Sequence, residues 1–173
     1  MHNQRIAAFL SGAWILGSLF MIFVATQNFK MADTIGNAET RATLRDMAGR
    51  LNQMFFVSWE RVELVLGIAL AAILWFGMRS RGLAGLAIAP LVLVAIQHFL
   101  VTPRMLALSA HLDAAADASQ FARLHALYGI SEVVKLLLVV ALAGLLLPTW
   151  RRAAASVERV QPVDYAHHGH IDR

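Results

Sequence analysis

Ionisable side chains lie inside apolar stretches of this chain, where an unpaired charge is costly. Glu60 and Glu63 are three residues apart, so both lie on one face if the segment is helical. Glu132 and Lys135 have the same spacing and predict a local ion pair. Charged residues in apolar spans normally face a bundle interior, pair with one another and mark a pathway or binding site. We predict one polar cluster from these residues: Glu60, Arg61, Glu63, Gln97, His98, His125, Glu132 and Lys135.

The same residues also permit a purely structural interpretation. Charges within the first turn or two of a span can reach the headgroups, and a buried network of acids and bases can simply hold helices in register. Lys135 lies deepest in its stretch and is least able to reach the headgroups. Both interpretations stay open from the sequence alone.

The histidines raise a third hypothesis. His98 and His125 lie at comparable depth in adjacent apolar stretches, an arrangement that a bis-histidine haem in a bundle uses. The C-terminal residues His167, His168 and His170 lack the preformed geometry of a metal site. We therefore expect no cofactor and no metal, and keep a b-type haem with His98 and His125 as ligands only as an alternative.

Four long apolar stretches must position these side chains. They cover residues 6–29, 55–78, 83–101 and 126–147. Each approaches or exceeds the run of about 20 apolar residues that crosses a hydrocarbon core about 30 Å thick. None shows the alternating pattern of a membrane barrel strand, so helices are expected. The sequence predicts an all-α, four-helix transmembrane bundle over residues 1–150.

The composition supports a membrane protein. Hydrophobic residues make up 58% of the chain and the mean hydropathy is +0.60, which leaves too much apolar surface for a soluble domain of 173 residues. The net charge of +4 comes from scattered basic residues and predicts no nucleic-acid binding. The absence of cysteine excludes disulfides and thiolate chemistry. The first stretch is longer than the core of a cleavable signal, so we expect it to be retained.

Two amphipathic segments are predicted as interfacial helices, over 38–54 and 105–124, with Asn37 or Asp33 capping the first. The short turn at 79–82 makes the second and third spans antiparallel neighbours. Pro103 and Pro148 are expected to end the third and fourth spans, and Pro90 to loosen the third. Residues 151–173 are predicted to form a polar, flexible tail.

Basic residues directly flank the spans at Arg5, at Arg79 and Arg81, and at Arg151 and Arg152. Cytoplasmic loops of membrane proteins carry an excess of basic residues. We therefore predict that both termini are cytoplasmic, in a plasma or inner membrane. The polar cluster then falls in the non-cytoplasmic half of the bilayer.

Several segments of the chain resemble the transmembrane-protein-205-like family of small four-span membrane proteins. The similar segments are FLSGAWILGSLF, the amphipathic link after it, the charged start of the second span, VTPR, and FARLHALYGISEVVKL. The resemblance covers most of residues 6–147 and implies membrane residence and this topology. It implies no settled reaction or ligand, although a eukaryotic member is associated with resistance to platinum drugs. The matched positions include Ser11, Gly12, Trp14, Pro103, Arg104, His125 and Gly129.

Three functions are compatible with these features. The first hypothesis is a structural or accessory subunit, whose small-residue pairs Gly67 with Ala71 and Gly85 with Ala89 dock on a membrane partner or a second copy. The alternative is a small transport or ligand-binding bundle with the polar cluster lining a cavity. The third is the haem-binding electron carrier. No common catalytic motif is present, and we expect no enzyme activity.

Overall fold

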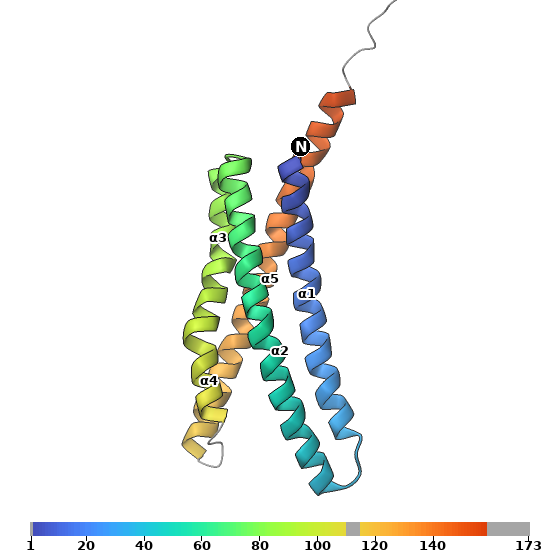
Figure 1. Ribbon diagram of the computed structural model, residues 1–173, viewed down its shortest axis with the longest axis vertical. Coiled ribbons are helices and arrows are strands. Elements are labelled where there is room, and N and C mark those ends of the chain that lie inside the picture. The colour runs from blue at the N-terminus through green and yellow to red at the C-terminus, as the bar shows by residue number, and fades with distance from the viewer. Residues whose placement is uncertain (1, 110–114, 159–173) are drawn as a thin grey trace, which may run out of the picture.

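The computed structural model describes residues 2–109 and 115–158, and every regular element within them is helical. The helices of the described residues join into four long rods, whose arrangement Figure 1 shows. The first is α1 (His2–Asp33), and the second is α2 (Ala38–Ala72) extended by the π-helix η1 (Ile73–Gly77). The third joins α3 (Arg81–Ile96), the π-helix η2 (Gln97–Val101) and α4 (Thr102–Ser109), and the fourth is α5 (Ala115–Glu158). The predicted all-α class is confirmed.

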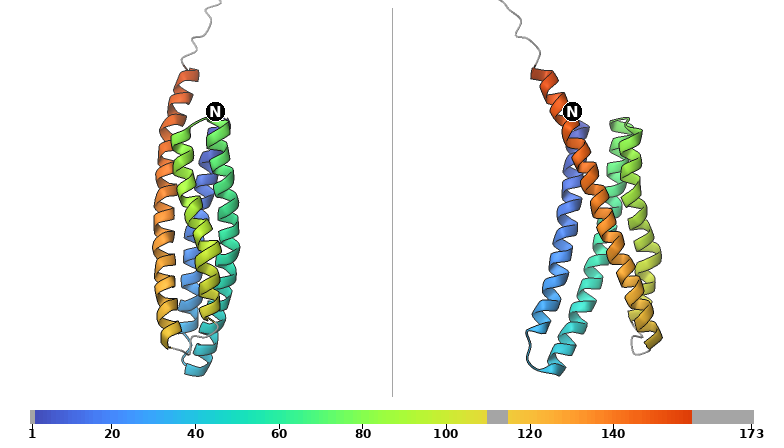
Figure 2. Two further views of the ribbon diagram at one scale, coloured as in Figure 1. Left: turned by 90° about the vertical axis from the view of Figure 1, so that its left-hand side faces the viewer. Right: turned by 180° about the vertical axis from the view of Figure 1, so that it is seen from behind.

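The rods form a closed ring in which α1 packs on α2 and α5, and α3 packs on the same two helices. The N-terminal end of α1, the α2–α3 turn and the C-terminal part of α5 lie at one end of the bundle (Figure 1). Toward the other end, the α1–α2 pair diverges from α4 and the start of α5 (Figure 2). The bundle is therefore tightly closed at one end and splayed at the other.

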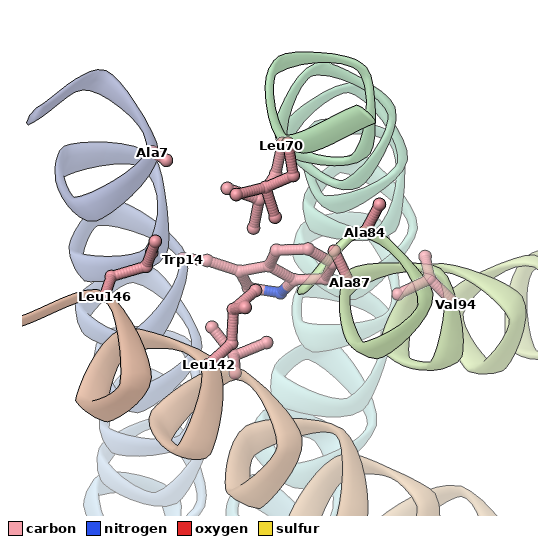
Figure 3. Close-up of a cluster of buried hydrophobic side chains, with 10 residues drawn as sticks. Ala7, Trp14, Leu70, Ala84, Ala87, Val94, Leu142 and Leu146 are labelled. Atoms are coloured by element: carbon pink, nitrogen blue, oxygen red, sulfur yellow. The ribbon is translucent and has the colours of Figure 1, made fainter. Parts of the chain in front are cut away.

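Buried residues recur at steps of three and four along each rod, the spacing of a single inward face. On α1 the buried positions include Gln4, Ala7, Ser11, Trp14 and Ser18. The apolar core lies in the closed half of the bundle, where the Trp14 ring sits between Leu70, Ala87 and Leu142 (Figure 3). Small residues of α3, Ala84 and Ala87, face this ring and allow the helices to approach closely.

Three of the described helical segments are long and apolar enough to cross a membrane: His2–Asp33, Arg81–Ser109 and Ala116–Leu147. The second rod is not among them, because the apolar part of α2 contains Glu60, Arg61 and Glu63. Large hydrophobic side chains are exposed along all four rods, including Phe20, Val65, Phe99 and Leu137. Such an apolar exterior suits a lipid environment.

The first amphipathic segment does not form a separate interfacial helix. Residues 38–54 continue without interruption into 55–72 as α2, and Asn37 caps the helix by accepting a hydrogen bond from the Thr40 amide, 3.0 Å away. Asn52 accepts a hydrogen bond from Asn28 at 2.7 Å, which holds this part of α2 against α1. The boundary predicted at residue 55 was wrong, because a rise in hydropathy does not itself break a helical backbone.

The prolines also do not end the spans where predicted. Pro103 lies in the first turn of α4, where a missing amide proton is tolerated. The preceding π-helix joins α3 to α4, and its last hydrogen bond runs from the Thr102 amide to the Gln97 carbonyl. Pro90 lies buried within continuous α3, and α5 continues past Pro148 to Glu158. Residues 151–158 of the predicted tail are thus helical, and 159–173 lie outside the described residues.

The segment 105–124 is divided between two rods rather than forming one surface helix. Its first part belongs to α4, which ends at Ser109, and its last part belongs to α5, which begins at Ala115. The two parts lie against each other, because α4 packs directly on α5.

Candidate functional site

Two fully buried carboxylates on α2 form the centre of the site. The side chains of Glu60 and Glu63 are both 0% exposed, on the same inward face as Gly67 and Leu70. The prediction that this pair shares one helix face is therefore confirmed. Their surroundings differ: Glu63 points toward the middle of the bundle, whereas Glu60 lines a pocket in the splayed half.

Glu63 is held by three side chains from two other helices. Its Oε1 accepts hydrogen bonds from Trp14 Nε1 at 2.9 Å and from Ser18 Oγ at 3.0 Å, both on α1. Its Oε2 lies 2.6 Å from the Nζ of Lys135 on α5. The carboxylate thus links α1, α2 and α5 through charge-assisted hydrogen bonds.

Lys135 is shared between two acids. Besides Glu63, its Nζ contacts Glu132 Oε1 at 2.6 Å, which confirms the predicted local ion pair. A third contact, at 3.3 Å, is to Gln97 Oε1. An ammonium group has three protons to donate, and these three acceptors use them all. Lys135 is 0% exposed, so it does not reach toward the headgroups.

The π-helix η2 directs two neighbouring residues to different acids. Gln97 Nε2 donates to Glu132 Oε1 at 3.0 Å and to Ser131 Oγ at 2.7 Å, both on α5. His98 Nδ1 lies 2.9 Å from Glu60 Oε2 on α2. Consecutive residues of a helix point in different directions, which lets η2 contact both neighbours at one level. π-Helical turns are frequent at functional sites.

Besides His98, Glu60 contacts a hydroxyl group from α4. Thr102 Oγ1 donates a hydrogen bond to Glu60 Oε1 at 2.6 Å, so each carboxylate oxygen has one partner. Both partners lie on the third rod. Glu60 therefore ties α2 to the segment where α3 continues into α4.

A pocket of about 470 Å³ opens beside Glu60 in the splayed half of the bundle. Its walls come from α1, α2, α4 and α5. The lining residues are Ile22, Ala25, Thr26, Phe29, Gly49, Asn52, Gln53, Phe56, Val57, Glu60, Thr102, Met105, Leu106, Phe121, His125 and Tyr128. The walls are mainly apolar and include a few polar groups, the composition typical of a small-molecule site.

One polar atom of the lining has no hydrogen bond of standard geometry. This atom is the hydroxyl of Tyr128, a residue that is only 9% exposed. The hydroxyl is buried and has no such hydrogen bond to any of the described residues. Tyr128 packs edge to face on Phe56, and its hydroxyl lies close enough to Glu60 for a hydrogen-bonding interaction that falls outside standard geometry. Buried hydroxyls normally have a well-placed partner, and a bound molecule can supply one here.

Six of the eight predicted site residues come together, and two do not. Arg61 and His125 are exposed; Arg61 faces outward from α2, whereas His125 stacks on Phe121 at the pocket wall. His98 does not line the pocket, and its Nδ1 is engaged by Glu60. The two histidines of the haem hypothesis therefore have different surroundings. The tail histidines lie outside the described residues.

The polar cluster also includes residues that sequence reasoning did not select: Trp14, Ser18, Thr102, Tyr128 and Ser131. Trp14 and Ser18 continue the three-and-four spacing of polar and small residues that begins at Gln4 and Ser11. That pattern marks an inward face and could have identified both.

Within residues 2–109 and 115–158, no group of three acidic or histidine side chains is arranged to hold a metal ion. Comparison of the chain with known protein families, with curated proteins and with solved structures found no match. The similarity to the transmembrane-protein-205-like family stays a prediction from its motifs.

Proposed function

We propose that this chain is a four-span integral membrane protein that binds a small molecule in the pocket beside Glu60, without catalysing a reaction. The observation that carries this proposal is the pocket of about 470 Å³, which combines apolar walls with a buried carboxylate and a hydroxyl that has no hydrogen bond of standard geometry to the described residues. Drug-sized ligands occupy clefts of about 300–1,000 Å³ with this composition.

The packing of α2 supports its role as the fourth span. Its two carboxylates face inward and have hydrogen-bond partners on other helices, while its outer face carries Val62, Val65 and Ile68. Charged residues in membrane helices are placed in this way, toward the interior of a bundle. The outward Arg61 has a long side chain that can extend toward the headgroups.

We further propose that both termini are cytoplasmic, in a plasma or inner membrane. Arg5 and the turn residues Arg79 and Arg81 lie toward the closed end of the bundle, which fits the excess of basic residues in cytoplasmic segments. The pocket then opens in the non-cytoplasmic half, where a ligand can enter from that aqueous surface.

Cysteine accessibility tests the binding function directly, because the natural sequence has no cysteine. Val57→Cys places a thiol in the pocket wall, and Val65→Cys places one on the outer face of the same helix, where Val65 is 67% exposed. In native membranes, N-ethylmaleimide should modify Val57→Cys and leave Val65→Cys largely unmodified, since thiolates form poorly in lipid. Gly36→Cys, in the exposed α1–α2 connection, provides the fully reactive reference.

Equal resistance of Val57→Cys and Val65→Cys would show that the pocket is not reached by water and would overturn the proposal. Reaction of Val57→Cys at a rate near that of Gly36→Cys would support an open binding cavity.

An accessory subunit is the second candidate, and one observation favours it. Gly85 and Ala89 are exposed on the outer face of α3, and a side-chain atom added at Gly85 would meet nothing within 4 Å. This small-residue surface permits close approach by a helix of a membrane partner or of a second copy. Disulfide crosslinking through Gly85→Cys, compared with Val65→Cys, tests it: a specific Gly85→Cys product would support the association.

A further inference from the structure

The buried cluster contains more acidic than basic groups. Three carboxylates, Glu60, Glu63 and Glu132, face one lysine, Lys135, and one histidine, His98. The basic groups are divided unevenly among these acids: Lys135 contacts Glu63 and Glu132, whereas Glu60 has only the imidazole of His98 beside it. A cation from outside the described residues would give Glu60 a charged partner.

Only one of the three acids is accessible to such a charge. Lys135 bridges Glu63 and Glu132, and neither of these acids lines the pocket. Glu60 does line it, and each of its oxygens has one hydrogen bond of standard geometry, with His98 or with Thr102. A carboxylate can accept about four hydrogen bonds, so Glu60 retains capacity toward the pocket.

The rest of the lining favours a cation over an anion. Among the lining residues there is no lysine or arginine, and the side chains that can carry charge are Glu60, His125 and Tyr128. Four aromatic rings contribute to the walls: Phe29, Phe56, Phe121 and Tyr128. Aromatic faces attract cations, most strongly where water is excluded. Tyr128 is only 9% exposed, and its hydroxyl can orient a polar group of the ligand beside Glu60.

We infer that the ligand of this pocket is an amphipathic organic cation, whose positive group lies beside Glu60 and Tyr128 and whose apolar body fills the wall between α1, α2, α4 and α5. This inference rests on the proposed binding function and names its ligand class. The buried carboxylate of Glu60 accounts for the positive group, and the aromatic and aliphatic walls account for the apolar body.

Two probes of the same shape and opposite charge test the inference. Tetraphenylphosphonium is a lipophilic cation, and tetraphenylborate is its anionic counterpart, which enters bilayers more readily. Each is added to membranes containing the full chain with Val57→Cys, and the rate of modification by N-ethylmaleimide is measured. We expect tetraphenylphosphonium to slow the reaction at concentrations at which tetraphenylborate has no effect.

Charge variants of α2 identify the responsible acid. Glu60→Gln should raise the concentration of tetraphenylphosphonium needed for half-protection by at least about tenfold, the equivalent of about 1.4 kcal/mol. Glu39→Gln makes the same chemical change at an exposed position of the same helix and should leave protection unchanged. If Glu60→Gln does not fold, the comparison of the two probes on Val57→Cys still decides the matter.

The possible outcomes separate this inference from the binding function. Equal protection by both probes would contradict a cationic ligand, and so would protection by neither probe while Val57→Cys still reacts. Both results would still agree with an accessible pocket. Failure of Val57→Cys to react at all would overturn the binding function itself. A further outcome is that Val57→Cys is protected from N-ethylmaleimide in vesicles that contain phosphatidylethanolamine and no added cation. That result would assign the site to a lipid headgroup and contradict the inference that the ligand is a free organic cation.

Discussion

The Nζ of Lys135 lies 2.6 Å from Oε2 of Glu63, and neither side chain is exposed. The two residues are 72 positions apart in the sequence and join α5 to α2 at the centre of the bundle. Because the same ammonium group also binds Glu132, it compensates two acids at once.

Lys135→Met should lower the free energy of unfolding by about 3–5 kcal/mol, since it leaves two acids without their basic partner. Denaturation of the purified protein in mild detergent measures this change. Lys30→Met, at an exposed position near the end of α1, should change stability by less than about 0.5 kcal/mol. Similar losses for both variants would contradict the central role of the ion pair.

Two tryptophans differ in one hydrogen bond. Trp14 donates its indole proton to Glu63, whereas the indole nitrogen of Trp59 is buried without a partner among the described residues. Trp14→Phe should therefore cost about 1–2 kcal/mol more than Trp59→Phe in the same denaturation experiment. A larger loss for Trp59→Phe would show that packing, not the bond to Glu63, dominates at Trp14.

Gly17 of α1 lies directly against the Trp59 ring of α2. A β-carbon at this position would overlap Cη2 of Trp59, so Gly17→Ala should displace that ring and lower the melting temperature. Gly12 is on the same helix and has nothing within 4 Å, so Gly12→Ala should be neutral or stabilise by up to about 1 kcal/mol. Thermal unfolding of the two variants side by side checks the contrast.

The α2–α3 turn contains a non-glycine residue in the left-handed backbone region. Arg79 has a φ of 52°, and glycine occupies this region at lower cost. We expect Arg79→Gly to raise the free energy of unfolding by about 1 kcal/mol. Arg81→Gly, at the first residue of α3, should lower it instead, because glycine weakens a helix.

Local spacing predicted much of this protein. The three-residue steps between Glu60 and Glu63, and between Glu132 and Lys135, depend only on the helical repeat, and the structure confirms both. The same holds for the Asn37 cap, which uses a hydrogen bond to a residue three positions away. The apolar stretches indicated helices able to cross a membrane, and three such segments are present in the described residues.

The tertiary structure decided what local spacing could not. Residues 54 and 55 belong to one helix, and Pro103 begins α4 instead of ending a span. The change in hydropathy and the proline were compatible with either outcome. The choice of Trp14 as a partner of Glu63 requires α1 and α2 to lie side by side. The pocket beside Glu60 exists only because α1 and α2 diverge from α4 and α5. Sequence by itself determined the helices and their inward polar faces, because these follow from the repeat of one backbone. The pairing of those faces, and the cavity between them, were decided by contacts between residues far apart in the chain.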